Sequence, residues 1–354
     1  YKYYIVVSSG YNNYKNDGAT RSVTTPDQAL FFLDVDKAIA TPWSEGSNYF
    51  KVVFRASDAT KANGLAKPGI RLGSAGEGIE FFAGDLQGNL WKAAFPEGLN
   101  TAKIATAVRK NASSVTTPLF TARDGTGVLQ AITVAPVVYP YSGGGNMVVF
   151  GTGKLLESAD RNTTATHTLY GVWDSGQTNA DSYNLVRSKL DQKTIDPGTK
   201  NISGPDSAYA NTSSSKRGWY ADLSVSRERL VVDPVATTGV VNIASTIPPT
   251  SECSDDGSGN VYYLDPASGD SVADTEVGTG YFGKGFIIDL DTSTASSSSY
   301  SDRGVSGSRT ATKKVAITNR GSTGQNVTKY LEVTYLRTGR VYWREVRDFN
   351  LVSQ

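Results

Sequence analysis

The chain has 354 residues, of which 38% are hydrophobic and 19% are charged, so it can build a packed core and is not globally disordered. Its 35 basic and 34 acidic residues balance and form no basic stripe, which argues against a nucleic-acid partner. One cysteine and one histidine exclude an internal disulfide and a Cys/His zinc site.

Short strands dominate the predicted secondary structure. Runs of β-branched and aromatic residues alternate with turns rich in Gly, Asn, Asp and Ser. The clearest pair joins residues 79–83 and 89–92 through a glycine-containing turn. The other predicted pairs are residues 3–7 with 29–34, 147–153 with 168–174, 239–244 with 260–265, and 331–335 with 339–344.

Helices and loops complete the predicted elements. One short helix is expected over residues 99–110, where apolar residues recur near helical spacing. Three long polar insertions, 158–166, 194–216 and 292–312, are predicted to be exposed loops. Within the last of them, the four serines at 296–299 are predicted to be disordered.

The repeated strand pairs predict the fold class. A repeat of roughly 40–50 residues is typical of a β-propeller, in which small antiparallel sheets cover one another's apolar faces. This repeat size allows roughly six to eight blades, and we favour seven. We therefore predict an all-β chain that forms one seven-bladed β-propeller domain over residues 1–354, with long decorated loops.

The ends of the chain and its hydropathy bear on its origin. No run of about 18 apolar residues occurs, so no transmembrane helix is expected. The chain begins with Tyr1-Lys2-Tyr3-Tyr4, without a methionine or a signal peptide, and we expect it to be a fragment of a longer precursor.

Candidate catalytic chemistry is scarce. His167 is the only imidazole available as a general base, and no Gly-x-Ser-x-Gly nucleophile motif accompanies it. The cluster Gly143-Gly144-Gly145 lacks the Lys-Ser/Thr of a phosphate loop, so it predicts a hairpin turn. We predict no catalytic residue and no enzymatic activity.

Candidate cation ligands are equally few. Asp255, Asp256 and Asn260 offer several oxygens within one short segment, although a hydrated turn before a strand explains the same residues. Two acidic pairs alternate along strand ends, where solvent exposure is the expected role: Asp34 with Asp36, and Asp289 with Asp291.

Five further segments occur in a fixed order along the chain. They are residues 83–92 (AGDLQGNLWK), 149–157 (VFGTGKLLE), 169–174 (LYGVWD), 218–223 (GWYADL) with 228–234 (ERLVVDP), and 342–345 (YWRE). Together they resemble the C-terminal domain of the PilC/PilY family of type IV pilus proteins. The resemblance implies a modified seven-bladed propeller at the C-terminal end of a longer secreted protein, located at the bacterial surface, the pilus tip or the outer membrane.

The resemblance also implies function and partners. It implies roles in pilus biogenesis against retraction, in twitching motility and virulence, and in adhesion to host cells or surfaces. The implied partners are minor pilins or the pilus tip complex, and a host-cell or surface receptor. Two alternatives stay open: a quinoprotein-like propeller enzyme, because residues 259–269 look like the blade repeat of that group, and a purely structural outer-membrane assembly scaffold.

A further expectation concerns the family's calcium loop. The resemblance implies an acidic calcium-binding loop just before the segment that begins at Ala83. Calcium takes about six to eight oxygen ligands, mostly carboxylates. The matching residues 69–78 offer only Glu77, beside Arg71, so we expect this calcium site to be lost and predict no metal or other cofactor.

Six tyrosines in or beside loops are candidates either to contact a partner or to brace the loops. They are Tyr11, Tyr14, Tyr139, Tyr141, Tyr183 and Tyr209.

Overall fold

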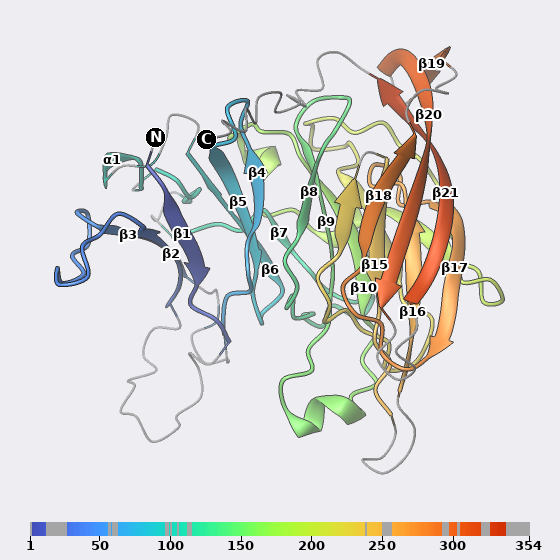
Figure 1. The fold of residues 1–354 in the computed structure, drawn as a ribbon, viewed down its shortest axis with the longest axis horizontal. Coiled ribbons are helices and arrows are strands. Elements are labelled where there is room, and N and C mark those ends of the chain that lie inside the picture. Colours follow the sequence, from blue (N-terminus) through green and yellow to red (C-terminus); the bar gives the residue numbers. More distant parts are fainter. Residues whose placement is uncertain are drawn as a thin grey trace, which may run out of the picture.

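The structure is a computed structural model. It describes residues 2–11, 27–55, 58, 63–95, 99, 101–104, 106–111, 115–237, 239–249, 257–291, 297–302, 305–319 and 326–337. Strands make up nearly all of its regular structure (Figure 1). The described strands form five sheets, and the all-β prediction is confirmed.

The first two sheets contain the predicted N-terminal strand pairs. The first sheet has the order β1 (Tyr4–Ser8), β2 (Asp27–Asp34), β3 (Tyr49–Arg55). The second has the order β4 (Gly69–Leu72), β5 (Gly78–Gly84), β6 (Asn89–Ala94), β7 (Phe120–Thr121). Antiparallel pairing of β1 with β2 and of β5 with β6 confirms both predictions.

The turn between β5 and β6 depends on Gly88. Its φ of 80° lies in the left-handed region that favours glycine. A Cβ at this position would lie 2.7 Å from the carbonyl oxygen of Gln130 and 2.8 Å from that of Ala122. The close approach lets the hairpin dock directly on the segment that leads into the third sheet.

The third sheet is the largest of the five. Its order is β12 (Ile202–Ser203), β11 (Asp191–Ile195), β13 (Gly218–Asp222), β10 (Thr168–Asp174), β9 (Asn146–Gly151), β8 (Val137–Pro140). The predicted pair β9–β10 is confirmed, and Gly144 and Gly145 form the predicted hairpin turn with positive φ. β11 joins β13 in parallel.

The last two sheets have four strands each. The fourth has the order β14 (Val235–Thr237), β15 (Val240–Ala244), β16 (Ser258–Leu264), β17 (Ser271–Thr279), and its pair β15–β16 was predicted. In the fifth, β18 (Phe286–Asp291), β19 (Ser297–Asp302) and β21 (Asn326–Arg337) all pair with β20 (Val305–Asn319).

The fifth sheet corrects the prediction of an exposed loop over 292–312. That segment contains β19 and the first half of β20, and three of the four serines predicted to be disordered lie in β19. The two strands pair residue by residue through their backbones, so the hairpin does not need the apolar residues on which the prediction relied. The predicted partner of residues 331–335, at 339–344, lies outside the described residues.

Helical structure is minor in the described part of the chain. The predicted helix over 99–110 is reduced to α1 (Thr101–Ile104), because the following residues turn back and Ala107 accepts a hydrogen bond from the backbone of Ala94 in β6. Three short 3-10 turns lie in or near the long insertions: η1 (Ser158–Asn162), η2 (Ala180–Ser182) and η3 (Arg187–Lys189). The insertion at 194–216 also contains the end of β11 and all of β12.

The sheets follow one another in chain order like the blades of a fan. β4 contacts β8, β8 contacts β14, and β14 contacts β18, so from the second sheet to the fifth the first strand of each sheet meets the first strand of the next. In Figure 1 the first sheet lies at one end of the view and the fifth at the other. This radial arrangement is that of a propeller. Seven blades and a single domain over 1–354 stay predictions.

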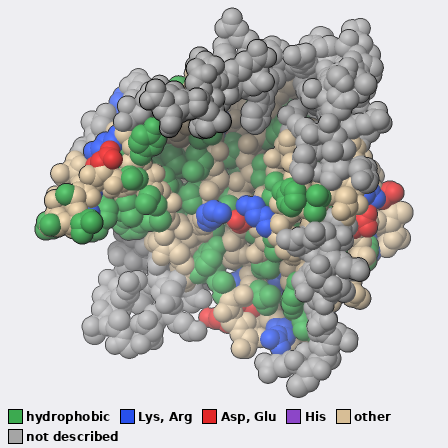
Figure 2. All heavy atoms as spheres, in the orientation of Figure 1, with side chains coloured by type: hydrophobic (Ala, Val, Ile, Leu, Met, Phe, Trp, Pro, Cys, Tyr) green, Lys and Arg blue, Asp and Glu red, His purple; other side chains and the backbone are tan. Residues whose placement is uncertain are grey.

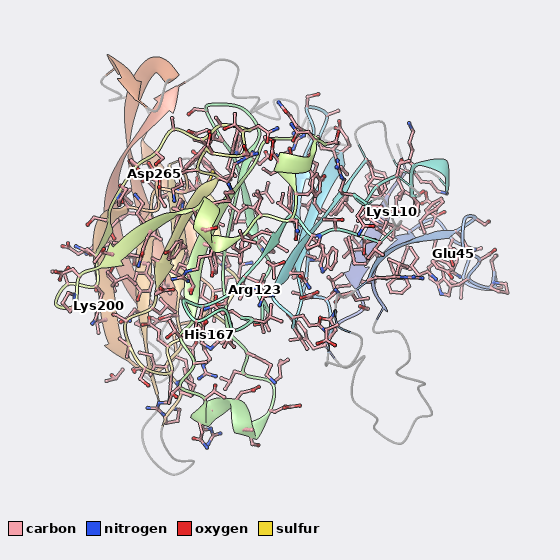
Figure 3. The ribbon with its side chains drawn as sticks, turned by 180° about the vertical axis from the view of Figure 1, so that it is seen from behind. Glu45, Lys110, Arg123, His167, Lys200 and Asp265 are labelled. Carbon is pink, nitrogen blue, oxygen red and sulfur yellow. The ribbon has the colours of Figure 1, made fainter. Side chains whose placement is uncertain are left out.

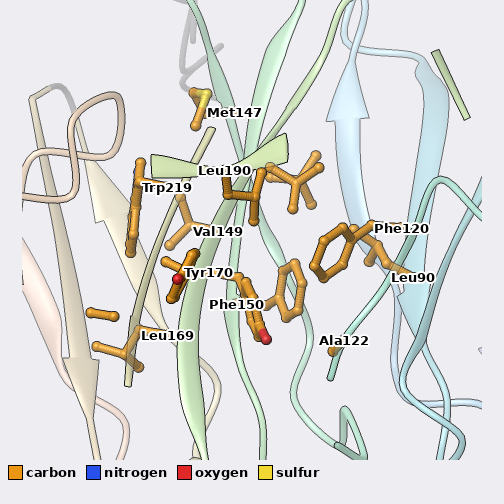
Figure 4. Packing of buried hydrophobic residues seen from close by; sticks show 14 of the residues in the cluster. Leu90, Phe120, Ala122, Met147, Val149, Phe150, Leu169, Tyr170, Leu190 and Trp219 are labelled. Carbon is orange, nitrogen blue, oxygen red and sulfur yellow. The ribbon is translucent and has the colours of Figure 1, made fainter. Parts of the chain in front are cut away.

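The hydrophobic core lies between the sheets. Phe120 of β7 packs against Phe150 of β9 and Tyr170 of β10, with ring centroids 6.2 and 5.0 Å apart (Figure 4). A second cluster fills the space between the first and second sheets, where Phe32 meets Phe81 at 5.0 Å. A third cluster joins the fourth and fifth sheets. Each sheet therefore buries its apolar face against a neighbour.

Candidate functional site

The segment at residues 83–92 builds a buried carboxylate site at the joint between the first two sheets. Asp85 is fully buried, and one of its oxygens accepts hydrogen bonds from Gln28 of β2 at 2.7 Å and from the Trp91 indole at 2.8 Å. Asn63 and the Asn89 side chain donate to the same oxygen, and the backbone N–H groups of Gln87 and Asn89 donate to the other. All six donors are neutral.

The electrostatics of Asp85 follow from this environment. Burial raises the pKa of the Asp85 carboxyl above its ordinary value, and the hydrogen bonds from Asn89, Trp91 and Gln28 oppose that rise. The carboxylate therefore ties β2 to the β5–β6 hairpin by hydrogen bonds alone.

The next joint uses charge instead. The Lys92 ammonium of β6 lies 2.5 Å from Asp174 of β10 and 2.8 Å from Glu80 of β5, and all three side chains are buried. Burial lowers the pKa of Lys92, but the two carboxylates outweigh it and hold the pKa above its ordinary value. Burial likewise opposes ionisation of Glu80, yet Lys92 and Arg71 hold its pKa below the ordinary value.

A second buried lysine joins the third and fourth sheets. The Lys193 ammonium of β11 lies 2.9 Å from Asp270, in the β16–β17 turn, and 3.1 Å from Asp206. The Trp219 indole of β13 donates to the Pro266 carbonyl oxygen across the same joint. Between the fourth and fifth sheets the buried contact is neutral, because Asn242 donates to Thr318 at 3.0 Å, and a partly exposed ion pair joins Lys329 to Glu276 at 2.9 Å. A buried polar contact thus crosses each of the four described joints.

A smaller charged cluster lies where the first strands of the sheets converge. One Asp233 oxygen accepts the backbone N–H of Ala135 at 2.8 Å, and the other lies 3.2 Å from the Lys67 ammonium and 3.8 Å from that of Lys284. Each of these four residues stands two positions before the first strand of its sheet. The shared offset is what a propeller repeat predicts near its axis. Figure 2 shows basic and acidic side chains together near the middle of one face, beside hydrophobic ones.

His167 is not placed for general-base catalysis. It is buried just before β10, and its Nδ1 lies 3.5 Å from the Thr152 hydroxyl (Figure 3). Burial and the nearby Arg229 guanidinium lower its pKa to about 4, so the imidazole is neutral at pH 7. Its surroundings are those of a core histidine.

The structure describes one of the three predicted cation ligands, Asn260. Asn260 donates at 2.7 Å to Glu228, a buried carboxylate that also accepts from Tyr262 and Ser245. Asp255 and Asp256 lie outside the described residues. Within the described part of the chain, no group of three or more His, Cys, Asp or Glu side chains is placed to hold a metal ion.

The other acidic candidates have local partners. Asp34 pairs with Lys2 at 2.7 Å and accepts the backbone N–H of Asp36. Glu77 accepts the backbone N–H of Ala75 in the tight β4–β5 turn, where the resemblance places the calcium loop. The side chains of Asp289 and Asp291 are outside the described part. Loss of the calcium site stays a prediction.

The loop tyrosines brace the fold where the structure describes them. Tyr141 and Tyr209 are buried, and their ring centroids lie 5.3 Å apart; Tyr209 stacks on Trp173, and Tyr141 meets Trp173 edge to face. The hydroxyls of Tyr11 and Tyr209 donate to distant backbone carbonyls, that of Tyr139 accepts the backbone N–H of Gly239, and the Tyr183 ring lies under Arg109. Tyr14 lies outside the described residues.

Sequence reasoning missed the buried lysines. Solvent exposure was the expected role of the two acidic pairs at strand ends, but Asp174, at the end of β10, is fully buried. A usable signal was present, because Lys92 and Asp174 each stand beside a tryptophan in a largely apolar run, and a strand that is apolar on both faces is buried on both faces. Which lysine meets which carboxylate depends on the packing of different sheets, and no local pattern encodes it.

No membrane-spanning helix is found in the described residues, where no helix is both long and apolar enough to cross a bilayer.

Comparison with known proteins gives concordant matches. Residues 1–204, more than half of the chain, match the family model described as the PilY1 beta-propeller domain. The chain is 29% identical over 309 residues to the type IV pilus biogenesis factor PilY1 of Pseudomonas aeruginosa PAO1, which covers 76% of this chain and 24% of that protein. It is 31% identical over 218 residues to a PilY1 homolog of Xylella fastidiosa, covering 58% and 14% respectively.

The fold also matches a solved structure. The crystal structure of the P. aeruginosa PilY1 C-terminal domain aligns with a TM-score of 0.56 and 24% sequence identity, covering 89% of this chain and 68% of that one. The chain spans about a quarter of the length of the P. aeruginosa relative that it matches.

Proposed function

Because the chain belongs to the PilY1 β-propeller domain family, we propose that it is the C-terminal propeller module of a type IV pilus biogenesis factor. In this role it supports pilus assembly against retraction and attachment to host cells or other surfaces. The observation that carries the proposal is the family match over residues 1–204. The names of the P. aeruginosa and X. fastidiosa relatives, which are pilus biogenesis factors, support it.

The architecture suits a module that works under mechanical load. Sheets that bury their apolar faces against one another resist separation, because parting them would expose that apolar surface to water. The ion pairs Lys92–Asp174 and Lys193–Asp270 cross two of the same joints. Loops at the rim of such a scaffold are free to vary and to bind. We assign partners on this basis: minor pilins or the pilus tip complex for assembly, and a surface receptor for attachment, with the module outside the cell at the pilus tip or outer membrane.

We further propose that the module works without catalysis. The neutral, buried His167 supports this, since it has no exposed position from which to accept a substrate proton. The stretch that resembles a quinoprotein repeat, residues 259–269, forms most of β16 and the turn into β17, and its Asn260 and Tyr262 bind Glu228. These contacts favour a packing role for the repeat.

Gene deletion tests the proposal. In the bacterium that encodes the chain, we expect deletion of the parent gene to remove surface pili, measured by immunoblot of sheared pilin, and to abolish twitching zones. The intact gene should restore both, and a gene lacking the propeller codons should not. A deletion strain with normal surface pili would contradict the proposal.

Two further assays separate the alternatives. Cross-linking and pull-down from surface fractions should recover minor pilins, whereas recovery of barrel-assembly proteins instead would favour an outer-membrane scaffold. Incubation of the purified chain with pyrroloquinoline quinone, calcium and an alcohol should give no dye reduction. Turnover in that assay would favour the enzyme.

A further inference from the structure

A pocket with both polar and apolar lining lies beside the joint between the second and third sheets. Its volume is about 370 Å³. Asp124 and Gly125 enter it from the turn after β7, Arg187 and Ser188 from η3, and Gln192 from β11. Lys216, which precedes β13, and Tyr220, which lies in β13, complete the lining. Segments of two sheets therefore converge on one cavity.

The residues that line this pocket are held in place by contacts with one another and with neighbouring residues. The Arg187 guanidinium lies over the Tyr220 ring, 3.8 Å from its centroid, and forms a two-pronged ion pair with Asp222. Asp124 accepts the backbone N–H groups of Thr126 and Val128 on one oxygen, which holds its own turn in place. A pocket held in this way is formed before any ligand arrives, and binding then costs little ordering of the protein.

Charges of both signs line the cavity, and each has contacts of its own. Lys216 donates to the backbone carbonyl oxygens of Leu190 at 2.7 Å and Ser188 at 3.4 Å and lies 3.9 Å from Asp191. Asp124 bonds to its own turn, so among the described contacts no ion pair joins Lys216 and Asp124. A plain anion would meet the Asp124 carboxylate and a plain cation would meet the Lys216 ammonium, whereas Arg187 is already paired with Asp222. A hydroxyl group both donates and accepts, so a ligand dense in hydroxyls satisfies both kinds of wall.

We propose that this pocket binds one or two units of a neutral saccharide, with hydroxyl groups donating to Asp124 and Gln192 and accepting from Lys216. The volume lies at the lower end of the range for small-molecule sites, which fits a ligand of that size. A peptide would require a deep apolar anchor, and the pocket offers only Leu190 and the covered Tyr220 ring. The inference rests on the proposed attachment role and names the chemical class of the receptor.

Binding is tested on the purified intact chain by isothermal titration and saturation-transfer NMR. The probes are four neutral saccharides: chitotetraose, maltotetraose, cellotetraose and lacto-N-tetraose. We expect at least one to bind, Asp124→Asn to weaken it at least fivefold, and Lys216→Gln to weaken it at least tenfold. The Asn side chain keeps the oxygen that caps the turn, so the first variant removes charge without removing the turn.

Matched variants control for charge and turn structure. Asp196 caps its own turn in the same way, through the backbone N–H groups of Gly198 and Thr199, so Asp196→Asn should bind like the parent chain. Lys37 also donates to backbone carbonyls but lies beyond β2 in the first sheet, so Lys37→Gln should be silent.

Four outcomes overturn the inference: no binding of any probe, equal binding by Asp124→Asn, full displacement by equimolar sodium phosphate at constant ionic strength, or tighter binding of hexaglutamate. Because this assay uses purified protein and the pilus assay uses surface pilin, the two can fail separately. Normal piliation together with absent saccharide binding would remove the pocket assignment and leave the proposed function standing.

Discussion

The first two joints between sheets bury a carboxylate in two different ways. Asp85 meets six neutral N–H donors, whereas Asp174 meets the Lys92 ammonium at 2.5 Å. Both carboxylates are fully buried. Neutral donors spread the charge over many weak contacts, and a single cation concentrates it in one strong contact. The first joint should therefore tolerate the loss of one donor, and the second should not tolerate the loss of its cation.

Removing the cation gives the largest expected effect. Lys92→Met strands Glu80 and Asp174 in the core, and we expect a loss of about 3–5 kcal/mol in the free energy of unfolding, measured by urea denaturation. Lys67→Met, at an exposed ion pair with Asp233, should cost less than about 1 kcal/mol. An equal loss of unfolding free energy in the two variants would contradict the claim that the buried cation matters more than the exposed one.

A double variant tests whether the stranded Asp174 charge causes this loss of stability. Lys92→Met combined with Asp174→Leu removes both members of the closest pair, and we expect it to be more stable than Lys92→Met alone, because one stranded charge has gone. A double variant that is less stable than the single would show that Asp174 contributes through contacts other than the lysine.

His167 provides a pH-dependent effect of intermediate size. Its pKa is about 4 in the folded chain and about 6.5 when exposed, so the unfolded state binds more protons between these values. Stability contributed by the neutral imidazole is present above pH 6.5 and is lost as the pH falls toward 4. Between pH 7 and pH 5 this amounts to about 2 kcal/mol.

The variant His167→Gln isolates this contribution. We expect it to be less stable at pH 7 but to lose about 2 kcal/mol less than the parent chain on acidification to pH 5, as followed by urea denaturation at both pH values. Asp85 acts in the opposite sense: its raised pKa gives stability that is full below about pH 3.8 and is lost as the pH rises. An unchanged pH profile in His167→Gln would contradict the burial argument.

The neutral joint gives the smallest expected effect among the buried contacts. Trp91→Phe keeps the ring against Phe54 but removes one of the six donors to Asp85, and we expect a loss of about 1.5 kcal/mol in the free energy of unfolding. A loss as large as that of Lys92→Met would show that the six donors act as one unit.

Much of the fold was predictable because its signals are local. The pair at 79–83 and 89–92 followed from apolar and aromatic runs on either side of a glycine-containing turn, and the structure places β5 and β6 there. The hairpin of β19 and β20 was missed because serine-rich strands give no apolar signal when the backbone ladder alone pairs them. The inter-sheet contacts were missed because Lys92 and Asp174 are 82 residues apart. The segment at 83–92, which carries part of the family resemblance, nevertheless contains both Asp85 and Lys92.

The requirement for an intact propeller is tested most directly by measuring surface pili in two strains. In one the parent gene carries Lys92→Met and in the other Lys67→Met, each at the chromosomal locus and with matched protein levels. We predict that Lys92→Met removes sheared pilin and twitching, because it breaks the buried contact between two sheets, and that Lys67→Met leaves both intact. Normal piliation in the Lys92→Met strain would contradict the claim that an intact propeller is required for pilus assembly.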